Sequence, residues 1–357
     1  MLKRAKYMCI ITIFFLRERY DRGKEKDMKK IINAVDQVEE QMIEGLRKAY
    51  PEYVKRVEGS SVLARAEKKE GKVALVSGGG SGHEPAHAGY IGKGMLDAAV
   101  PGAVFTSPTP DQVYEAIKAV ATDKGVLMIV KNYTGDVMNF EMAADMARDE
   151  GITVDEVVVN DDVAVDGSLY TVGRRGVAGT VFVHKITGAK AETGASLEEV
   201  KATAEKVIAN VRSMSMAIRP CTVPAAGKPG FELGEDEMEI GIGIHGEPGT
   251  HREALRPADE IVDMLLDKIL ADIDYAGHEV AVMINGCGAT PLMELFVVNN
   301  HVHDVLEAKG IKVYRTFVGE FMTSLEMEGF SISLLRLDDE MKTLLDAPAD
   351  TPAFKVL

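Results

Sequence analysis

The first candidate for chemistry is a glycine-rich turn that follows a short apolar run. Residues 72–77 read Lys-Val-Ala-Leu-Val-Ser, and residues 78–83 continue Gly-Gly-Gly-Ser-Gly-His. Successive glycines leave backbone N–H groups bare, so a small polar ligand can approach them closely. The turn lacks the Gly-Lys-Ser/Thr of a nucleotide-binding P-loop and does not match the dinucleotide fingerprint. It predicts a site for a small polar ligand, with a ligand-free flexible turn as the alternative.

The same turn contains a formal match to the zinc-protease signature H-E-x-x-H, from His83 to His87. That signature binds zinc only in mid-helix, where residues four apart share a face. Pro85 lacks a backbone N–H and fits only the first turn of a helix. His83 would then precede the helix and the two imidazoles would diverge. We therefore predict no metal site here.

A lysine and an aspartate lie together in the turn after a second apolar run. Residues 125–130 read Gly-Val-Leu-Met-Ile-Val, and Lys131 and Asp136 belong to the turn that follows. A carboxylate at the tip of such a strand, beside a lysine, can accept a proton from a substrate hydroxyl. The alternative is a structural turn aspartate with a neighbouring surface lysine.

A single histidine, His245, occupies a third turn, in which residues 241–249 read Gly-Ile-Gly-Ile-His-Gly-Glu-Pro-Gly. Its small neighbours would leave the ring accessible, which suits a neutral imidazole nucleophile. The alternative is a histidine that is only a satisfied core or surface residue.

Two further pairs of residues, two aspartates and two cysteines, have side chains that could bind a metal or react. Asp161 and Asp162 follow the apolar residues 157–159 and could hold a metal, but a solvated turn is the favoured interpretation. Cys221 and Cys287 have no nearby histidine or C-x-x-C partner, so we predict that both are small core residues.

Between these turns the chain alternates between strand-like and helix-like segments. Short apolar runs ended by turn residues predict strands at 72–77, 125–130, 157–159, 238–244, 279–285, 313–318 and 331–337. Apolar residues at helical spacing predict helices at 28–46, 111–121, 140–147, 196–217 and 258–273, with Ser196 and Glu199 as a capping box. The alternation predicts an α/β fold with parallel or mixed sheets flanked by helices. In such folds ligands bind beyond the carboxyl ends of the strands.

The length of 357 residues suggests one large or two medium domains. The four residues Gly-His-Glu-Pro at 82–85 are weakly similar to His-Gly-Glu-Pro at 245–248. Two related α/β units that face one site would explain this similarity. We predict a first α/β domain over 28–190 and a second over 191–357. Residues 1–27 are basic around an apolar stretch too short to span a bilayer. We interpret them as an extension from a non-native upstream start, with a peripheral membrane anchor as the alternative.

Composition excludes several classes of protein. With 46% hydrophobic residues the chain can bury a core, so wholesale disorder is excluded. The formal charge of −15 argues against binding a phosphate backbone, and we expect no nucleic-acid and no membrane partner. Three scattered cysteines cannot form a disulfide framework, which favours a cytoplasmic location.

Eight stretches of the sequence resemble, in order, the substrate-binding subunit of dihydroxyacetone kinase. They are residues 77–85, 105–110, 131–136, 170–176, 221–229, 243–248, 288–291 and 329–332. The resemblance covers residues 28–354 as one K-type unit. It implies a two-domain α/β homodimer that binds dihydroxyacetone and takes part in its phosphorylation, in the phosphotransferase-system-dependent type of the enzyme.

The resemblance also implies roles for individual residues. His245 would form a hemiaminal with the ketone carbon of dihydroxyacetone, which an alcohol such as glycerol cannot do. His83 and Asp136 would act on the hydroxyl that receives phosphate, with Asp136 as the base. The substrate would be lined by Gly80, Ser81, Gly82, His83, Lys131 and Asp136.

The phosphoryl donor is expected on other polypeptides, because the chain has no recognisable loop for a nucleotide. The resemblance implies no cofactor in this chain. ADP or ATP with magnesium would be held by a nucleotide-binding L-type subunit, which a phosphohistidine-carrying M-type subunit would serve. Some paralogues in the family only sense the ketone and co-activate transcription. The presence of both His83 and Asp136 beside His245 favours catalysis over that alternative.

Overall fold

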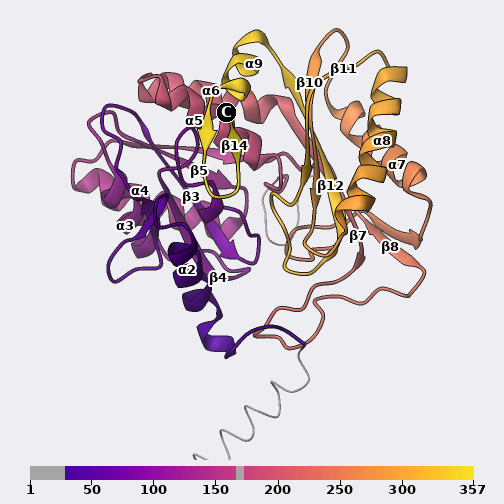
Figure 1. Ribbon diagram of the computed structural model, residues 1–357, viewed down its shortest axis with the longest axis horizontal. Coiled ribbons are helices and arrows are strands. Elements are labelled where there is room, and N and C mark those ends of the chain that lie inside the picture. The colour runs from indigo at the N-terminus through magenta and orange to yellow at the C-terminus, as the bar shows by residue number, and fades with distance from the viewer. Residues whose placement is uncertain (1–28, 166–172) are drawn as a thin grey trace, which may run out of the picture.

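The computed structural model describes residues 29–165 and 173–357, which form two six-stranded sheets with helices between and outside them (Figure 1). The predicted α/β class, with mixed sheets flanked by helices, is confirmed. The extension predicted at residues 1–27 lies outside the described residues, as do residues 170–172 of one family-like stretch.

The first sheet is built from the first half of the chain and has the strand order β1-β2-β4-β3-β5-β6. Its strands are β1 (Val54–Arg56), β2 (Leu63–Arg65), β3 (Ala74–Ser81), β4 (Ala98–Val104), β5 (Val126–Lys131) and β6 (Val154–Val159). The four strands β4, β3, β5 and β6 are parallel, so their carboxyl ends meet at one edge. The turns after β3 and β5 are those that the sequence singled out for chemistry.

The second sheet has the order β11-β10-β12-β7-β8-β9 and is mostly antiparallel, with β10 and β11 as its parallel pair. Its strands are β7 (Val211–Arg219), β8 (Glu237–Ile240), β9 (His251–Ala254), β10 (Glu279–Gly286), β11 (Lys312–Gly319) and β12 (Glu328–Leu337). A short pair, β13 (Ala349–Asp350) and β14 (Lys355–Val356), follows.

The helices form an outer layer on each side and a middle layer between the sheets (Figure 1). They are α2 (Val38–Ala49), α3 (Pro110–Val120), α4 (Thr134–Asp149), α5 (Thr180–Glu192), α6 (Leu197–Asn210), α7 (Ala258–Asp272), α8 (Leu292–Ala308) and α9 (Asp339–Asp346), with single 3-10 turns at Val35–Gln37 and Ala88–Tyr90. Helices α3 and α4 cover the outer face of the first sheet, and α7 and α8 that of the second. Helices α5, α6 and α9 lie between the sheets.

The middle layer holds a core to which both sheets contribute. In β5, Leu127 and Ile129 point into this shared core, whereas Val126 and Met128 point toward α3 and α4. Met283 of β10 enters the same shared core from the second sheet. Alternate residues of a strand point to opposite faces, so each sheet is buried on both sides. The division into domains at residue 190 stays a prediction, because the core does not divide there.

All seven predicted strands are present with shifted ends, but the long helix predicted over 196–217 is wrong. Ser196 does cap α6 in a capping box with Glu199, and the helix then ends at Asn210. Val211–Arg219 instead forms β7, paired on one side with β12 and on the other with β8. Pairing with two strands overrides a local pattern that fits helix and strand alike.

Two further expectations are corrected. The first helix does not begin at residue 28: residues 29–34 are irregular, and α2 begins at Val38 after a 3-10 turn. Asp161 and Asp162 are not in a solvated turn, since both are almost fully buried. Asp161 accepts hydrogen bonds from the backbone of Val177 and Gly179, and Asp162 pairs with the buried Arg175. Burial of the predicted core residues Cys221 and Cys287 is confirmed.

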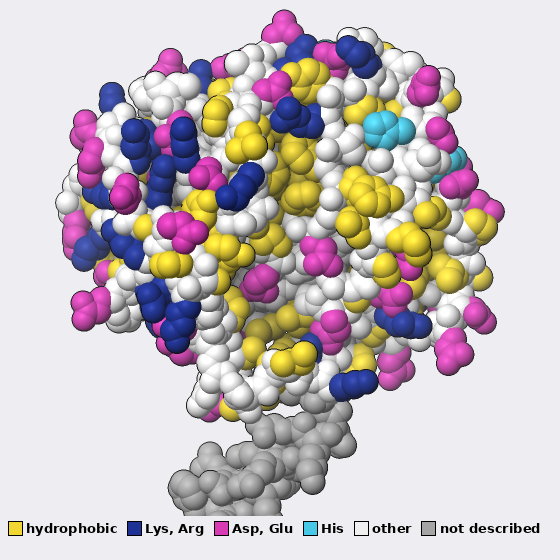
Figure 2. All heavy atoms as spheres, in the orientation of Figure 1, with side chains coloured by type: hydrophobic (Ala, Val, Ile, Leu, Met, Phe, Trp, Pro, Cys, Tyr) yellow, Lys and Arg dark blue, Asp and Glu magenta, His cyan; other side chains and the backbone are white. Residues whose placement is uncertain are grey.

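The last residues of the described chain return to the first half. Asp350 donates its backbone N–H to Lys93, and Ala353 donates to Gly89. The ring of Phe354 lies between Tyr90 of the first half and Phe317 of the second, with centroid distances of 6.5 and 5.4 Å. Figure 2 shows that this face of the molecule is hollowed along the line where the two halves meet. The two halves are thus joined by more than the single connection through α5 and α6.

Candidate functional site

A cavity of about 620 Å³ opens where the carboxyl edge of the first sheet meets the loops of the second. The first half contributes a residue of β3 and residues that follow β4 and β5, and the second contributes the connection between β7 and β8 and the loop after β8. It is lined by Gly80, Phe105, Ser107, Tyr133, Thr134, Gly135, Asp136, Gly230, Phe231, His245, Gly246, Glu247 and Pro248. Ligand sites are expected at this edge of a parallel sheet.

His245 lines the cavity with one ring nitrogen held by a carboxylate. Its Nδ1 lies 2.7 Å from Oε1 of Glu247, and its backbone N–H donates to Oε2 of the same group at 2.9 Å. Burial would raise the pKa of Glu247, but the adjacent imidazole and its hydrogen bond lower that pKa to about 2. The ionised carboxylate therefore accepts the Nδ1 proton, which leaves a lone pair on Nε2. The histidine is neither a core residue nor a free surface residue, because its side chain is 19% exposed.

His83 lies beside His245 but behind the cavity wall. Its ring is fully buried, stacks on Phe105 at 5.0 Å, and meets the ring of His245 edge-on at 4.8 Å. Nδ1 lies 2.8 Å from the carbonyl oxygen of Thr323, so Nδ1 carries the proton. Nε2 has no hydrogen-bond partner among the described residues. Burial, followed by the nearby His245 and Lys131, holds the pKa of His83 well below its usual range, which keeps the ring neutral.

Asp136 and Lys131 form a buried pair at the start of α4. Lys131 Nζ lies 3.6 Å from Oδ2 of Asp136, and both side chains are at most 5% exposed. The surface-lysine alternative is therefore excluded. Asp136 occupies the first turn of α4, where the helix dipole favours a carboxylate. Its other oxygen, Oδ1, is buried and without a partner in the described chain. Asp136 lines the cavity, and a ligand bound there can supply the missing partner.

Aromatic rings restrict the space around His245. Tyr133 and Phe105 meet its ring edge-on, with centroid distances of 4.7 and 5.2 Å. The Tyr133 hydroxyl is buried, and within residues 29–165 and 173–357 it has no hydrogen-bond partner. Burial, with the nearby charge of Glu247, raises the pKa of Tyr133 well above its usual range, so the hydroxyl stays a donor.

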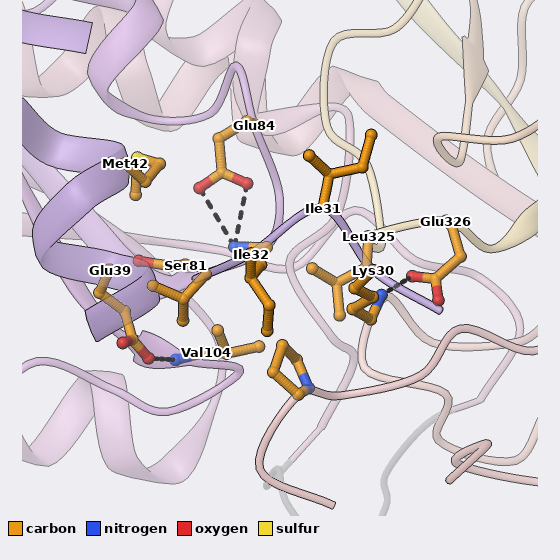
Figure 3. Close-up of a pocket in the computed structure, with 13 residues that line it drawn as sticks. Lys30, Ile31, Ile32, Glu39, Met42, Ser81, Glu84, Val104, Leu325 and Glu326 are labelled. Carbon is orange, nitrogen blue, oxygen red and sulfur yellow. Dashed lines mark hydrogen bonds and ion pairs between the residues drawn. The ribbon is translucent and has the colours of Figure 1, made fainter. Parts of the chain in front are cut away.

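The glycine-rich turn divides between two cavities. Gly80 lines the site described above, whereas Ser81 and Gly82 line a second cavity of about 300 Å³. Figure 3 shows that Ile32 lies in this second cavity, between Met42 of α2 and Leu325. The Ser81 hydroxyl donates to Gly102, and the Gly82 N–H donates to the carboxylate of Glu84.

The zinc-like stretch His83–His87 is a turn and not a helix. His83 and His87 have separate neighbours, Thr323 and Lys131 respectively. No group of three metal-ligating side chains is present in the part of the chain that the structure describes. None of the described helices is both long and apolar enough to cross a bilayer.

The structure places four residues predicted from the sequence close together: His83, Asp136, Lys131 and His245. Asp136 and His245 line the cavity, whereas Lys131 and His83 lie behind its lining. Sequence reasoning missed Glu247, which follows His245 by two residues and turns back onto its ring. The signal was present, since a carboxylate next to a histidine can orient it. It also missed the carbonyl of Thr323, which lies in the connection between β11 and β12 and has no sequence signal.

The arrangement can perform two kinds of chemistry side by side. His245 and His83 both have Nδ1 engaged, and among the described residues neither has a hydrogen-bond partner on Nε2, as a nucleophile or hydrogen-bond acceptor requires. Asp136 adds a carboxylate oxygen that can take a proton. A small carbonyl compound with hydroxyl groups fits both requirements.

Comparison with known proteins gives a consistent result. The sequence model of the Dak1 domain matches residues 44–353. The chain is 60% identical to PTS-dependent dihydroxyacetone kinase 1, dihydroxyacetone-binding subunit DhaK, of Listeria innocua, over 92% of this chain and 100% of the relative.

Two solved structures are also similar. The dihydroxyacetone kinase of C. freundii superposes with a TM-score of 0.86 at 35% identity, over 92% of this chain and 60% of that one. The dihydroxyacetone kinase operon co-activator Dha-DhaQ superposes with a TM-score of 0.83 at 37% identity, over 88% of this chain and 97% of that one. The match to the Dak1 domain spans most of the sequence, and the chain therefore belongs to the Dak1 domain family, as the resemblance to dihydroxyacetone kinase subunits implied.

Proposed function

We propose that this chain is the dihydroxyacetone-binding subunit of a dihydroxyacetone kinase, a phosphotransferase of the type that depends on the phosphotransferase system. It captures the ketone on His245 and presents a terminal hydroxyl for phosphorylation. The observation that carries the proposal is the His245–Glu247 pair, whose 2.7 Å contact leaves Nε2 free at the cavity. The 60% identity to a dihydroxyacetone-binding subunit supports the choice of substrate.

Capture is an addition of the imidazole to the ketone. The Nε2 lone pair forms a bond to the carbonyl carbon, the C=O π electrons move to oxygen, and that oxygen takes a proton from water. The ring then carries positive charge until it loses the Nδ1 proton. Glu247 lies at that proton and stabilises the charge, because it is ionised and 90% or more shielded from solvent. Glycerol has no carbonyl and cannot form this bond.

Transfer occurs at a terminal hydroxyl of the captured molecule. Asp136 Oδ1 takes the hydroxyl proton as that oxygen attacks phosphorus, and the Lys131 ammonium stabilises the carboxylate from the other side. His83 Nε2 accepts a hydrogen bond from the substrate close to His245. Covalent capture holds the hydroxyl in place for this step, which lowers the entropic cost of reaction.

The phosphoryl group comes from other subunits in this proposal. A nucleotide-binding L-type subunit holds ADP or ATP with magnesium, and a phosphohistidine-carrying M-type subunit recharges it. The relatives from Listeria innocua and Escherichia coli are named as PTS-dependent and PEP-dependent kinase subunits, which supports this arrangement. The chain acts as a homodimer in the cytoplasm.

Intact-mass spectrometry with dihydroxyacetone tests the capture step. Wild-type protein should gain a labile adduct of one ketone per chain, and His245→Ala should lose the adduct and its discrimination against glycerol. His251→Ala, which alters an exposed histidine on β9, is the matched control and should keep the adduct. An adduct that survives His245→Ala would assign the nucleophile to another residue.

A second function is favoured by the similarity to the operon co-activator at a TM-score of 0.83. In that case the chain would bind the ketone and then a transcription factor. The two functions are separated by adding a nucleotide-bearing subunit, ATP and magnesium. Formation of dihydroxyacetone phosphate supports the kinase, and ketone capture with no phosphate transfer to any such subunit supports the sensor.

A further inference from the structure

A row of buried polar side chains runs inward from the cavity, behind Asp136. Lys131 Nζ lies 3.0 Å from Nε2 of His87, and His87 Nδ1 lies 2.9 Å from Nε2 of His184. His87 belongs to the turn after β3 and His184 to α5. Neither residue lines the cavity, both are at least nine-tenths buried, and neither takes part in the reaction described above.

The hydrogen bonds of this row can run in one direction only. An ammonium group donates and never accepts, so Lys131 donates to His87 Nε2. His87 then carries its proton on Nδ1 and donates it to His184 Nε2 at 2.9 Å, which is nearer than the Ser77 hydroxyl oxygen at 3.4 Å. His184 in turn carries its proton on Nδ1, which has no partner in the described part of the chain. Both imidazoles are neutral acceptors and the single charge of the row stays on Lys131.

The row determines where the Lys131 ammonium points. One N–H donates to the carbonyl oxygen of Gly78 at 3.0 Å and a second to His87. The third direction is left for Oδ2 of Asp136 at 3.6 Å. A side chain at Gly79 would collide with Nζ, so the lysine is held in a fitted space. Because Oδ2 faces the lysine, Oδ1 is the oxygen that remains for the substrate.

We propose that His87, supported by His184, is a positioning residue that holds Lys131 against one oxygen of Asp136 and so aims the other oxygen at the substrate hydroxyl. The inference rests on the proposed role of Asp136 as the base. A neutral acceptor suits this purpose, because a second carboxylate would compete with Asp136 for the cation. Burial, together with the positive Lys131, holds the pKa of His87 well below its usual range and lowers that of His184 to about 3.

Within residues 29–165 and 173–357, four titratable groups act on Lys131 or are acted on by it. They come from the turn after β3, from α4 and from α5, and they are His83, His87, Asp136 and His184. Asp136 is the anion of this set. Loss of the His87 acceptor should therefore destabilise the ammonium of Lys131 and favour its neutral form at lower pH.

The test uses His87→Leu, which removes the acceptor, and His87→Gln, whose amide oxygen can accept from Lys131. Thr187→Val is the control, since Thr187 is buried one turn after His184 on α5 and its hydroxyl has no partner among the described residues. Each protein is assayed for the dihydroxyacetone adduct by intact mass, and for kcat against pH with the nucleotide-bearing subunit. Melting temperatures identify variants that fail to fold.

His87→Leu should still form the adduct, but its kcat should fall on the order of 10²-fold below that of wild type. The alkaline limb of its kcat–pH profile should shift to lower pH. His87→Gln should recover most of both effects, and Thr187→Val should match wild type. Should His87→Leu not fold, His184→Leu should show the same shift with a smaller loss. An unchanged pH profile, or equal losses in the leucine and glutamine variants, would reduce His87 to a packing residue. If wild-type protein forms no adduct with dihydroxyacetone, the proposed function itself is overturned.

Discussion

His245 in the cavity and His83 behind its wall have the same ring, but the group bound to Nδ1 differs. His245 donates to a carboxylate, which stabilises the positive charge that develops when Nε2 forms a bond. His83 donates to a backbone carbonyl, which fixes the tautomer without supplying a negative charge. These environments suit the roles proposed above, with His245 as the nucleophile and His83 as a hydrogen-bonding residue. The sequence already singled out His245 as the nucleophile, but it gave no sign of the Thr323 carbonyl that fixes the tautomer of His83, because that partner comes from a distant loop.

Asp136→Asn should separate capture from transfer. The amide is nearly isosteric with the carboxylate, but it cannot take a proton at neutral pH. We expect the dihydroxyacetone adduct on His245 to persist while kcat of phosphate transfer falls by ~10²–10⁴-fold, the usual range for a positioned base. The measurement is turnover with the nucleotide-bearing subunit beside intact mass. Near-normal turnover would move the role of base to His83.

Glu247 should make stability depend on pH. Its pKa is lowered to about 2, so its contribution is fully present above its unfolded value of ~4.3 and is lost as pH falls toward 2. We expect Glu247→Gln to be less stable than wild type by about 3 kcal/mol at pH 7, with the difference shrinking below pH ~4.3. Urea unfolding at a series of pH values measures it.

Glu44→Gln is the matched control for that experiment. The pKa of Glu44 is also lowered to about 2, first by its hydrogen bond from Arg47, but the pair lies on the surface of α2. Solvent screens such pairs, so this variant should show little pH-dependent difference. A Glu247→Gln curve that runs parallel to wild type from pH 7 to pH 2 would contradict the ionic role of Glu247.

At the scale of helices and strands, prediction succeeded where a local pattern had a single interpretation. Strands such as β5 and β10 are apolar runs bounded by turn residues, and α7 has apolar residues at helical spacing. Helix α5 was missed because it is buried on nearly every side and so lacks an amphipathic pattern. Strand β7 was wrongly predicted as helix because its pairing with β12 and β8 cannot be inferred from its local sequence.

Strand β3 should not tolerate a side chain at Gly79. A Cβ there would collide with Nζ of Lys131, and the backbone φ of +150° disfavours other residues. Gly79→Ala should keep the adduct on His245 but lower kcat on the order of 10²-fold, because Lys131 is displaced. Gly151→Ala is the control, with φ of +83° and open space around it. If both variants lose stability alike and neither loses kcat, the close approach to Lys131 has no functional meaning.

At the scale of the whole molecule, the two sheets share one core. The core of the middle layer takes side chains from both sheets and from α5, α6 and α9. Phe354 adds contacts to Tyr90 and Phe317, one from each half. The site is built across the same junction, since Asp136 comes from one half and His245 from the other. Their relative position therefore depends on the packing of the middle layer.

Calorimetry should show one unfolding transition for the whole chain. Phe354→Ala should lower stability by about 3–5 kcal/mol, the usual cost of removing a buried phenylalanine, and should do so for both halves together. Phe354→Leu, which keeps most of the apolar volume, should cost less. Two resolved transitions in the wild type, with only one moved by Phe354→Ala, would show that the halves are independent domains.

The return of residues 349–356 to the first half also bears on how a cell makes this protein. The loop at residues 88–94, directly after His87, bonds to backbone groups of Asp350 and Ala353. Those partners leave the ribosome long after the first sheet has been synthesised. Until they arrive, the inner face of that sheet, with Leu75, Leu127 and Ile129, has no complete cover. During much of its translation the nascent chain therefore exposes an apolar sheet face that is prone to aggregation. We expect chaperones that shield such surfaces to bind it.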